Sequence, residues 1–249
     1  MNYQFKNGGG FLPTLRTLYK EGGIVRFYRG IVPALVIGPI SRFGDTAMNM
    51  FATSLSQNNE TLKKMPIFVQ TSIGSVLAGG WRLSTLPVDA WKTSKQVYGD
   101  QGLKNLLTKF KTHGISAFYQ GGVASALATM VGHYPWFVTN NYLEHYLGKY
   151  SYESDLLKAL VRSAFIGLCS TVVSDVCSNS IRVVKTFKQT ATEKLTYNQV
   201  ISAVIEKDGV SGLFLRGLQT KLLTNVLQGV TFRVIWKYME NQMNKKPKA

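Results

Sequence analysis

Three copies of one glycine-centred pattern constrain this chain more than any other feature. Each copy has a turn glycine and, seven or eight residues later, a second glycine close behind an aromatic residue; the second glycines are Gly30, Gly121 and Gly217. Their separations are 91 (30 to 121) and 96 (121 to 217), and a Lys-Thr-x-Lys-Gln marker recurs from Lys92 to Lys185, 93 residues apart. Self-similarity of this kind indicates a repeated architecture, here two long helices and their connections per repeat.

Charge and hydropathy together favour a membrane protein. The net charge is +16, from 29 Lys and Arg against 13 Asp and Glu, while 45% of the residues are hydrophobic. A balance of this kind indicates either nucleic acid or an anionic membrane as the partner. Residues 121–143 contain no Asp, Glu, Lys or Arg and are long enough to cross a bilayer as a helix. The aromatic residues fall in such apolar stretches, not beside basic ones, which excludes a nucleic-acid surface.

The remaining apolar stretches each carry one or two charges: 31–56, 67–88, 156–181 and 221–240. A charge exposed to lipid is costly, so these residues are expected to face one another or a wet interior. Hydropathy alone supports about two spans. The sequence predicts an all-α chain in which amphipathic surface helices (12–21, 101–112 and 197–207) alternate with membrane helices that begin near residues 30, 66, 121, 154 and 217.

No catalytic or metal-binding signature is present in the sequence. Cys169 and Cys177 lie eight residues apart in an apolar helix-like run, too far apart to form a disulfide, and are expected to be buried thiols. Metal-ligand spacings, nucleophile triads and phosphate loops are all missing. We therefore expect no enzymatic activity, no cofactor and no metal.

The segment 87–92 (Pro-Val-Asp-Ala-Trp-Lys), followed by the glycine pattern that ends at Gly121, resembles the mitochondrial carrier family. The resemblance extends over essentially the whole chain. It implies three repeats around a central cavity, each with an odd-numbered helix carrying a Pro-x-acid-x-x-base kink, a surface helix and an even-numbered helix. The expected repeats are 1–56 (partial), 57–149 and 150–249, joined in one membrane domain.

Two departures from the family pattern matter for function. The chain begins inside the first surface helix, so five of the usual six transmembrane helices are expected; either it belongs to a longer protein or the protein has five. The third kink motif, 180–185, reads Ser-Ile-Arg-Val-Val-Lys, with Ser in place of Pro and Arg in place of an acid.

The resemblance implies a matrix-side gate of carboxylate–lysine pairs between odd helices. Pro87 should bend its helix inward, and Asp89 and Lys92, three residues apart, should share one helix face. Here the expected ring is reduced to Asp89 with Lys185, because Lys92 has lost its partner and Arg182 would repel a base. The full set at this gate, including the two brace glutamines, is Asp89, Lys92, Arg182, Lys185, Gln96 and Gln189.

At the opposite gate the family places an acid and then a base near the ends of the even helices. This chain has Met50 with Thr53, Asn141 with Glu144, and Lys237 with Glu240 at these positions. Glu144 could still meet Lys237, but a strong closed gate is not expected on this side.

The family's substrate contacts centre on the residue seven past each motif glycine. The residues at these points are uncharged, which disfavours a large polyanion, and nearby polar residues extend the set. Arg82 and Asp175, at equivalent positions 93 residues apart, are expected to form an intramembrane ion pair with a structural role. His133 lies among aromatics and is expected to be a packing residue rather than a proton-coupling one. The contact candidates are Ile37, Ala128, Thr129, Thr224, Asn225, Lys221, Arg42, Asp45 and His133.

Taken together, these features predict a carrier-like protein of the mitochondrial inner membrane that moves a small solute by alternating access. The basic surface helices would face the matrix or cytoplasmic side, and the expected partners are the solute and anionic lipids such as cardiolipin, without nucleic acid. The alternative is a non-transporting, carrier-derived subunit of an inner-membrane assembly with protein partners. Its motivation is the missing helix, the eroded gates and the neutral contact points.

Overall fold

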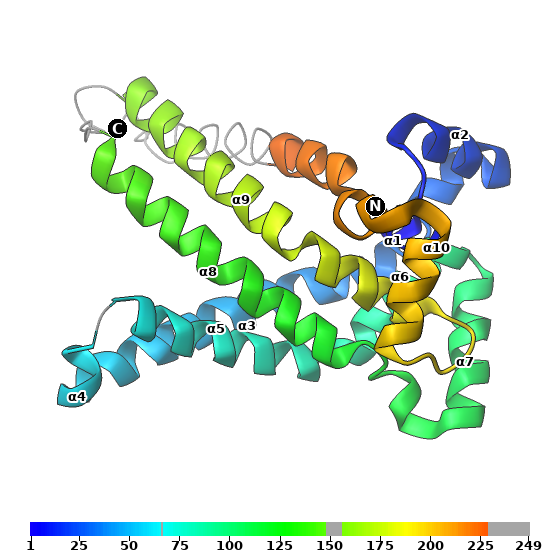
Figure 1. The fold of residues 1–249 in the computed structure, drawn as a ribbon, viewed down its shortest axis with the longest axis horizontal. Helices are drawn as coiled ribbons and strands as arrows, with labels where there is room; N and C mark the ends of the chain where they lie inside the picture. The colour runs from blue at the N-terminus through cyan, green and yellow to red at the C-terminus, as the bar shows by residue number, and fades with distance from the viewer. Residues whose placement is uncertain (66, 148–155, 229–249) are drawn as a thin grey trace, which may run out of the picture.

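A computed structural model describes residues 1–65, 67–147 and 156–228 of the chain, and this part is built of helices without a strand (Figure 1). The prediction of an all-α fold is confirmed. Residues 218–228 are helical and follow Gly217. The elements are α1 (Asn2–Asn7), α2 (Phe11–Gly22), η1 (Ile24–Tyr28), α3 (Ile31–Asn58), α4 (Glu60–Lys63), α5 (Ile67–Ser84), α6 (Leu86–Tyr98), α7 (Gln101–His113), η2 (Gly114–Ala117), α8 (Gly122–Tyr146), α9 (Leu156–Thr190) and α10 (Tyr197–Leu215).

The glycine pattern of the sequence is a pattern of left-handed backbone. The motif glycines Gly30, Gly121 and Gly217 have φ of 93°, 81° and 64°, and each directly precedes a long helix. The turn glycines that end the surface helices repeat the same feature, with Gly114 at φ 60° after α7 and Gly209 at φ 70° where α10 is broken. Only glycine adopts this conformation at low cost, so the repeated sequence encodes a repeated turn.

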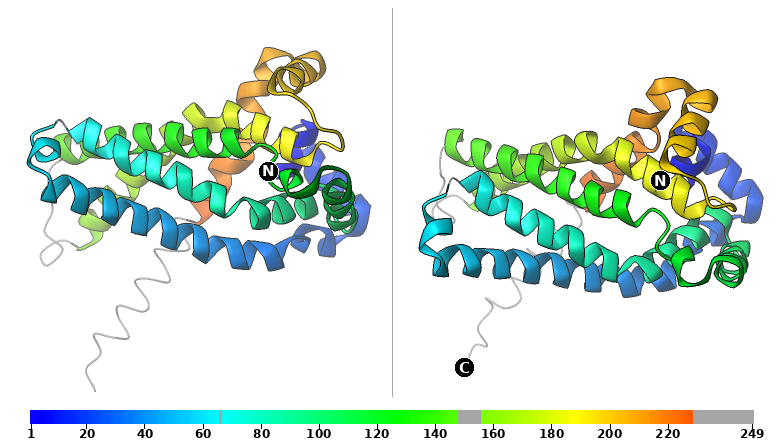
Figure 2. Two further views of the ribbon diagram at one scale, coloured as in Figure 1. Left: turned by 90° about the horizontal axis from the view of Figure 1, so that it is seen from below. Right: turned by 60° about the horizontal axis from the view of Figure 1, so that its bottom comes forward.

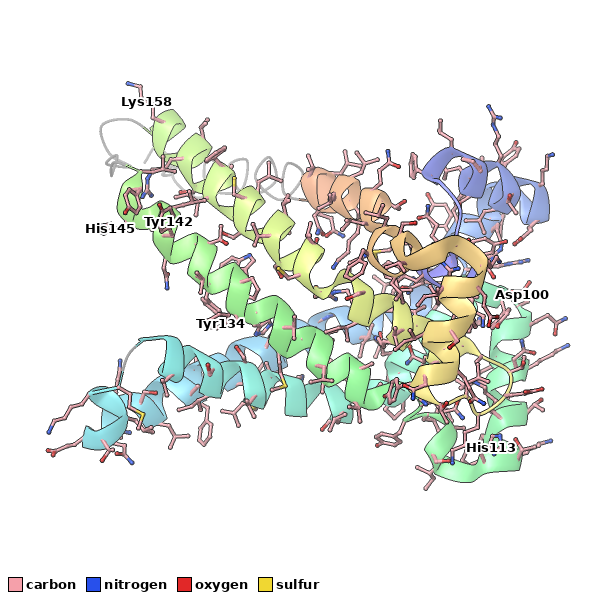
Figure 3. The ribbon with its side chains drawn as sticks, in the orientation of Figure 1. Asp100, His113, Tyr134, Tyr142, His145 and Lys158 are labelled. Carbon is pink, nitrogen blue, oxygen red and sulfur yellow. The ribbon has the colours of Figure 1, made fainter. Side chains whose placement is uncertain are left out.

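The long helices run side by side, and the short ones collect at one end. α8 packs against α9 and α5, and α3 packs against α5, as the two further views in Figure 2 show. α1, α2, α7 and α10 lie together, near the N-terminus (Figure 1). We call this end of the molecule, which holds α1, α2, α7 and α10, the surface-helix end. Figure 3 shows Asp100 and His113 there, just before α7 and at its last residue, with Tyr142, His145 and Lys158 at the far end of α8 and α9.

The two kink motifs give different helices. α5 ends at Ser84 and α6 begins at Leu86, with Pro87 in the first turn of α6. A proline cannot donate to the preceding turn, so the helical ladder is interrupted there. In the third repeat Ser180 stands at the proline position, and α9 runs unbroken from Leu156 to Thr190. The substitution noted in the sequence therefore removes a kink.

Much of the apolar surface of the long helices faces outward. Residues 24–58 and 161–190 are long and apolar enough to cross a membrane by length and composition, and only 22% and 33% of their apolar windows are buried inside the protein. A helix in a soluble core would be mostly buried, so these faces suit lipid better than water. Cys177 is exposed and Cys169 partly exposed, so the prediction of two buried thiols was wrong for Cys177: its side of α9 faces outward.

Candidate functional site

An ion cluster at the surface-helix end joins α6 to α9. The Asp89 carboxylate, on α6, contacts Lys185 of α9 through Oδ2 and lies 2.9 Å from Lys92 Nζ through Oδ1. The three side chains are only 15–24% exposed. The structure thus brings together the expected partners Asp89 and Lys185. It also gives Lys92 a partner, because one carboxylate has two oxygens and bridges both ammonium groups.

The glutamines next to this cluster lie at helix ends. Gln96 Oε1 accepts a 2.6 Å hydrogen bond from Asn2 Nδ2 of α1. Gln189, 1% exposed, accepts a 3.1 Å bond at its main-chain oxygen from the Nζ of Lys109 on α7, and this Nζ also donates to Gln120 Oε1 at 3.2 Å. Gln96 therefore links α6 to α1 through its side chain, and Gln189 links α9 to α7 through its main-chain oxygen.

Sequence analysis overlooked α1, which packs against α6 and α9. A six-residue segment carries too weak a periodicity to predict a helix. The repeat itself could have indicated this helix, because Phe5 precedes Gly30 by 25 residues and Gln96, at the end of α6, precedes Gly121 by the same 25. In the structure α1 lies against α6 and α9, at the end of the bundle where these two helices meet.

The even-numbered helices begin against these ends in a repeated contact. A Cβ placed on Gly121 would lie 2.9 Å from the main-chain oxygen of Lys185, and one on Gly30 would lie 3.3 Å from that of Lys92. At Gly217 the corresponding oxygen is that of Met1, at 3.4 Å. Each motif glycine thus lets the start of one helix approach the backbone of a neighbouring helix closely.

Deeper in the bundle the structure corrects the predicted Arg82–Asp175 pair. Arg82 of α5 contacts Asp45 of α3 at 3.3 Å and donates to Ser41 Oγ at 2.8 Å. Asp175 of α9 contacts Lys221 instead, and Asn225 donates to the same carboxylate. Equivalent register did not bring Arg82 and Asp175 together, because each residue pairs with the helix that packs directly beside its own.

The other expected contact residues divide into buried and exposed groups. Ile37, Ala128 and Thr129 are 4%, 3% and 8% exposed, so they are packed inside the protein. Thr224 is exposed, and its hydroxyl donates to the Thr220 carbonyl at 2.7 Å. His133 is half-buried and meets Phe137 edge-on, with ring centroids 6.3 Å apart. The side chain of Arg42 lies outside the described residues.

Arg182 of α9 lies between these two groups of charges. Its Nε donates to Ser178 Oγ at 3.0 Å, and its charged neighbours are Asp175, Arg82 and Asp89. Both neighbouring carboxylates contact lysines. Within the described residues no carboxylate lies within ion-pair distance of the Arg182 guanidinium.

At the far end of the bundle Glu144 has a partner that the sequence did not indicate. Arg162 Nη2 lies 2.6 Å from Glu144 Oε2 and also donates to the main-chain oxygen of Leu147 at 2.9 Å. The other two residues of the expected opposite gate, Lys237 and Glu240, lie outside the described residues. No family pattern marks Arg162, so sequence reasoning had no signal for it.

Basic side chains are also buried among the surface helices. Lys109 is 6% exposed, and burial lowers its pKa to about 8. Burial likewise lowers the pKa of Lys6, on α1, to about 8, and its Nζ lies 3.6 Å from the centre of the Phe187 ring. In the described part of the chain no three His, Cys, Asp or Glu side chains gather in a way that could hold a metal ion.

Residues 158–247 match the family model described as mitochondrial carrier protein. This stretch runs through α9, α10 and the following helix and includes Arg182, Lys185 and Lys221. No curated protein matches the chain.

Proposed function

Because residues 158–247 carry a mitochondrial carrier domain, which supports membership of the chain in the mitochondrial carrier family, we propose that this protein moves a small solute across the mitochondrial inner membrane by alternating access. Members of this family are transporters rather than enzymes. The family also suggests the inner membrane as the location, in agreement with the two long apolar helices.

The observation that carries the proposal is the Asp89–Lys92–Lys185 cluster. It joins helices of two different repeats and lies where their ends meet the surface helices. A buried ion pair adds little net stability compared with apolar residues of similar size, so a fixed structural role explains it poorly. A cross-repeat pair that breaks and forms again can instead hold one end closed in one state and release it in another.

The packing of the repeats supports the same mechanism. Gly121 lets the start of α8 approach the Lys185 carbonyl, so a shift of α9 at the ion cluster must move α8 as well. The second and third repeats are coupled at the end where the gate is proposed. Two arrangements of this contact would then correspond to the closed and open states of that end.

Uptake into proteoliposomes tests the proposal. The purified protein should accumulate at least one solute among small carboxylates, phosphate, amino acids and nucleotides above the level of empty vesicles. Asp89→Asn should change this flux about tenfold or more, because it unpairs two buried lysines. Asp100→Asn, which removes a 72% exposed carboxylate at the same end, should leave the flux unchanged.

Two outcomes would contradict the proposal. Equal flux in Asp89→Asn and the unmodified protein would show that the ion cluster is no gate. An absence of flux for every solute would favour the non-transporting subunit, and the protein extracted gently from membranes should then migrate as a large particle with other chains.

A further inference from the structure

Within the described residues, Arg182 has no carboxylate at ion-pair distance, whereas the charged side chains near it are paired. Its position, three residues before Lys185, is the one at which the family pattern has an acid, and sequence analysis found only that it would repel a base. In the structure it is half-buried, and its Nε donates to the Ser178 hydroxyl. A guanidinium in such surroundings is costly unless an anion accepts its remaining donors.

The surrounding charges leave an excess of positive charge. The ion cluster, the two deeper ion pairs and Arg182 itself together contain five basic and three acidic side chains, and the difference is two positive charges. Every carboxylate is already engaged, because Asp45 contacts Arg82, Asp175 contacts Lys221, and Asp89 is shared by two lysines. The five basic residues are Arg82, Lys92, Arg182, Lys185 and Lys221.

We propose that the transported solute is a small anion with one or two negative charges and no ammonium group, and that Arg182 binds its carboxylate or phosphate. This inference rests on the proposed transport function. The planar guanidinium presents parallel donors that match two oxygens of a carboxylate or phosphate group. Nη2 of Arg182 lies beside Gly132 of α8, next to the hydroxyl groups of Ser174 and Ser178.

The paired carboxylates exclude the other small solutes. An ammonium group needs a carboxylate or several free carbonyl oxygens to replace its water. Asp175 already receives both Lys221 and the Asn225 amide, and Asp89 receives two lysines. An amino acid or a polyamine would therefore have to break an existing pair, whereas an anion adds a missing partner. The excess of two positive charges among the described side chains matches an anion that carries one or two negative charges.

Uptake and thermal unfolding of the full chain together test this inference. Proteoliposomes are offered labelled succinate and phosphate as anions, glycine as a zwitterion and putrescine as a cation. We expect uptake of succinate or phosphate and about tenfold less uptake by Arg182→Gln, because the buried charge that binds the anion is gone. Arg182→Lys keeps the charge but loses the planar guanidinium. Its uptake should lie between that of the unmodified protein and that of Arg182→Gln.

The control variant is Arg16→Gln, which removes the same charge from an exposed position on α2 and should transport like the unmodified protein. As a second measurement, the anion should raise the Tm of the detergent-solubilised protein and of Arg16→Gln, but not that of Arg182→Gln. The Tm without ligand shows whether Arg182→Gln is folded.

The outcomes separate this inference from the proposed function. Uptake of glycine or putrescine alone, or anion uptake unaffected by Arg182→Gln, overturns the anion assignment and leaves transport standing. A Tm rise that depends on Arg182 without uptake of any solute overturns transport and leaves the anion site standing. Uptake of no solute and no change of Tm overturns both.

Discussion

Lys109 donates a 3.1 Å hydrogen bond from its buried ammonium group to the main-chain oxygen of Gln189, so α7 of the second repeat is fastened to the end of α9 in the third. No carboxylate takes part in this contact; the second acceptor is the Gln120 amide oxygen at 3.2 Å. The link therefore depends on a lysine that remains charged although it is buried.

The first prediction concerns the pH dependence of this link. Burial lowers the pKa of Lys109 to about 8 from the ordinary 10.5, so the unfolded chain binds this proton more tightly than the folded protein does. The free energy of unfolding should therefore rise as the pH increases from about 8 to 10.5. Lys109→Met should flatten the rise of Tm over this window, and the remaining slope should come from the other buried lysines, Lys6 among them.

The control for this measurement is Lys104→Met, on the exposed face of the same helix. It should keep the pH slope of the unmodified protein. A slope that is the same in Lys109→Met and in the unmodified protein would show that Lys109 titrates alike in the folded and unfolded states.

The second prediction is that Asp89→Asn destabilises the protein by about 3–5 kcal/mol, because two buried lysines lose their shared carboxylate. The additional change Lys185→Met should restore part of the loss, since one of the unpaired charges is then removed. Thermal unfolding of the single and double variants measures both effects. Equal Tm values for Asp89→Asn and the unmodified protein would contradict a buried, paired cluster. Lys95→Met, on the same helix, is the control and should leave the Tm unchanged.

The third prediction concerns Gly121. Its φ of 81° and the 2.9 Å approach of a Cβ to the Lys185 carbonyl both oppose a side chain. Gly121→Ala should cost about 1–3 kcal/mol, measured by thermal unfolding. Gly167→Ala in α9, where a Cβ meets nothing within 4 Å, should instead be neutral or stabilising by up to about 1 kcal/mol. If both substitutions behave alike, α8 does not approach α9 at Gly121 as described.

The fourth prediction compares two arginines of the first repeat. Arg26 is 3% exposed, and besides its ion pair with Glu21 it donates to the carbonyls of Gln96 and Val97 at 3.2 and 2.9 Å. Arg26→Met should therefore cost about 3 kcal/mol, because these acceptors at the end of α6 lose a charged donor.

Arg29, three residues later, pairs with the exposed Asp100 at 2.7 Å. Arg29→Met should cost about 1 kcal/mol or less, because solvent screens such a pair. The Tm values of the two variants test this difference. A larger decrease of Tm for Arg29→Met than for Arg26→Met would contradict it.

The repeat pattern was sufficient to predict the general fold. Gly30 and Gly121 recur because a left-handed turn must precede each even helix, and this requirement appears directly in the sequence. The segment around Pro87 likewise predicted a kink where α5 ends and α6 begins. A local backbone constraint of this kind requires one residue type, glycine or proline, at a fixed position in the chain. It can therefore be recognised from the sequence alone.

The side-chain partners were harder to predict, because they depend on which helices lie side by side. Arg82 was expected to meet Asp175 by register, yet Asp45 on the adjacent α3 is its partner. Lys92 was expected to be unpaired, but Asp89 in its own helix reaches it. A long ionic side chain has several oppositely charged groups within reach, and only the packing angles decide between them.

The unbroken α9 has a mechanical consequence. A continuous ladder of main-chain hydrogen bonds from Leu156 to Thr190 resists bending over its whole length, whereas the second repeat has a joint between α5 and α6. The two helices joined by the Asp89 carboxylate therefore differ in stiffness: α9 is continuous and stiff, whereas α6 is joined to α5 by a hinge. In the proposed transport cycle α9 should therefore move as one body, and the bending between α5 and α6 should be concentrated at Thr85.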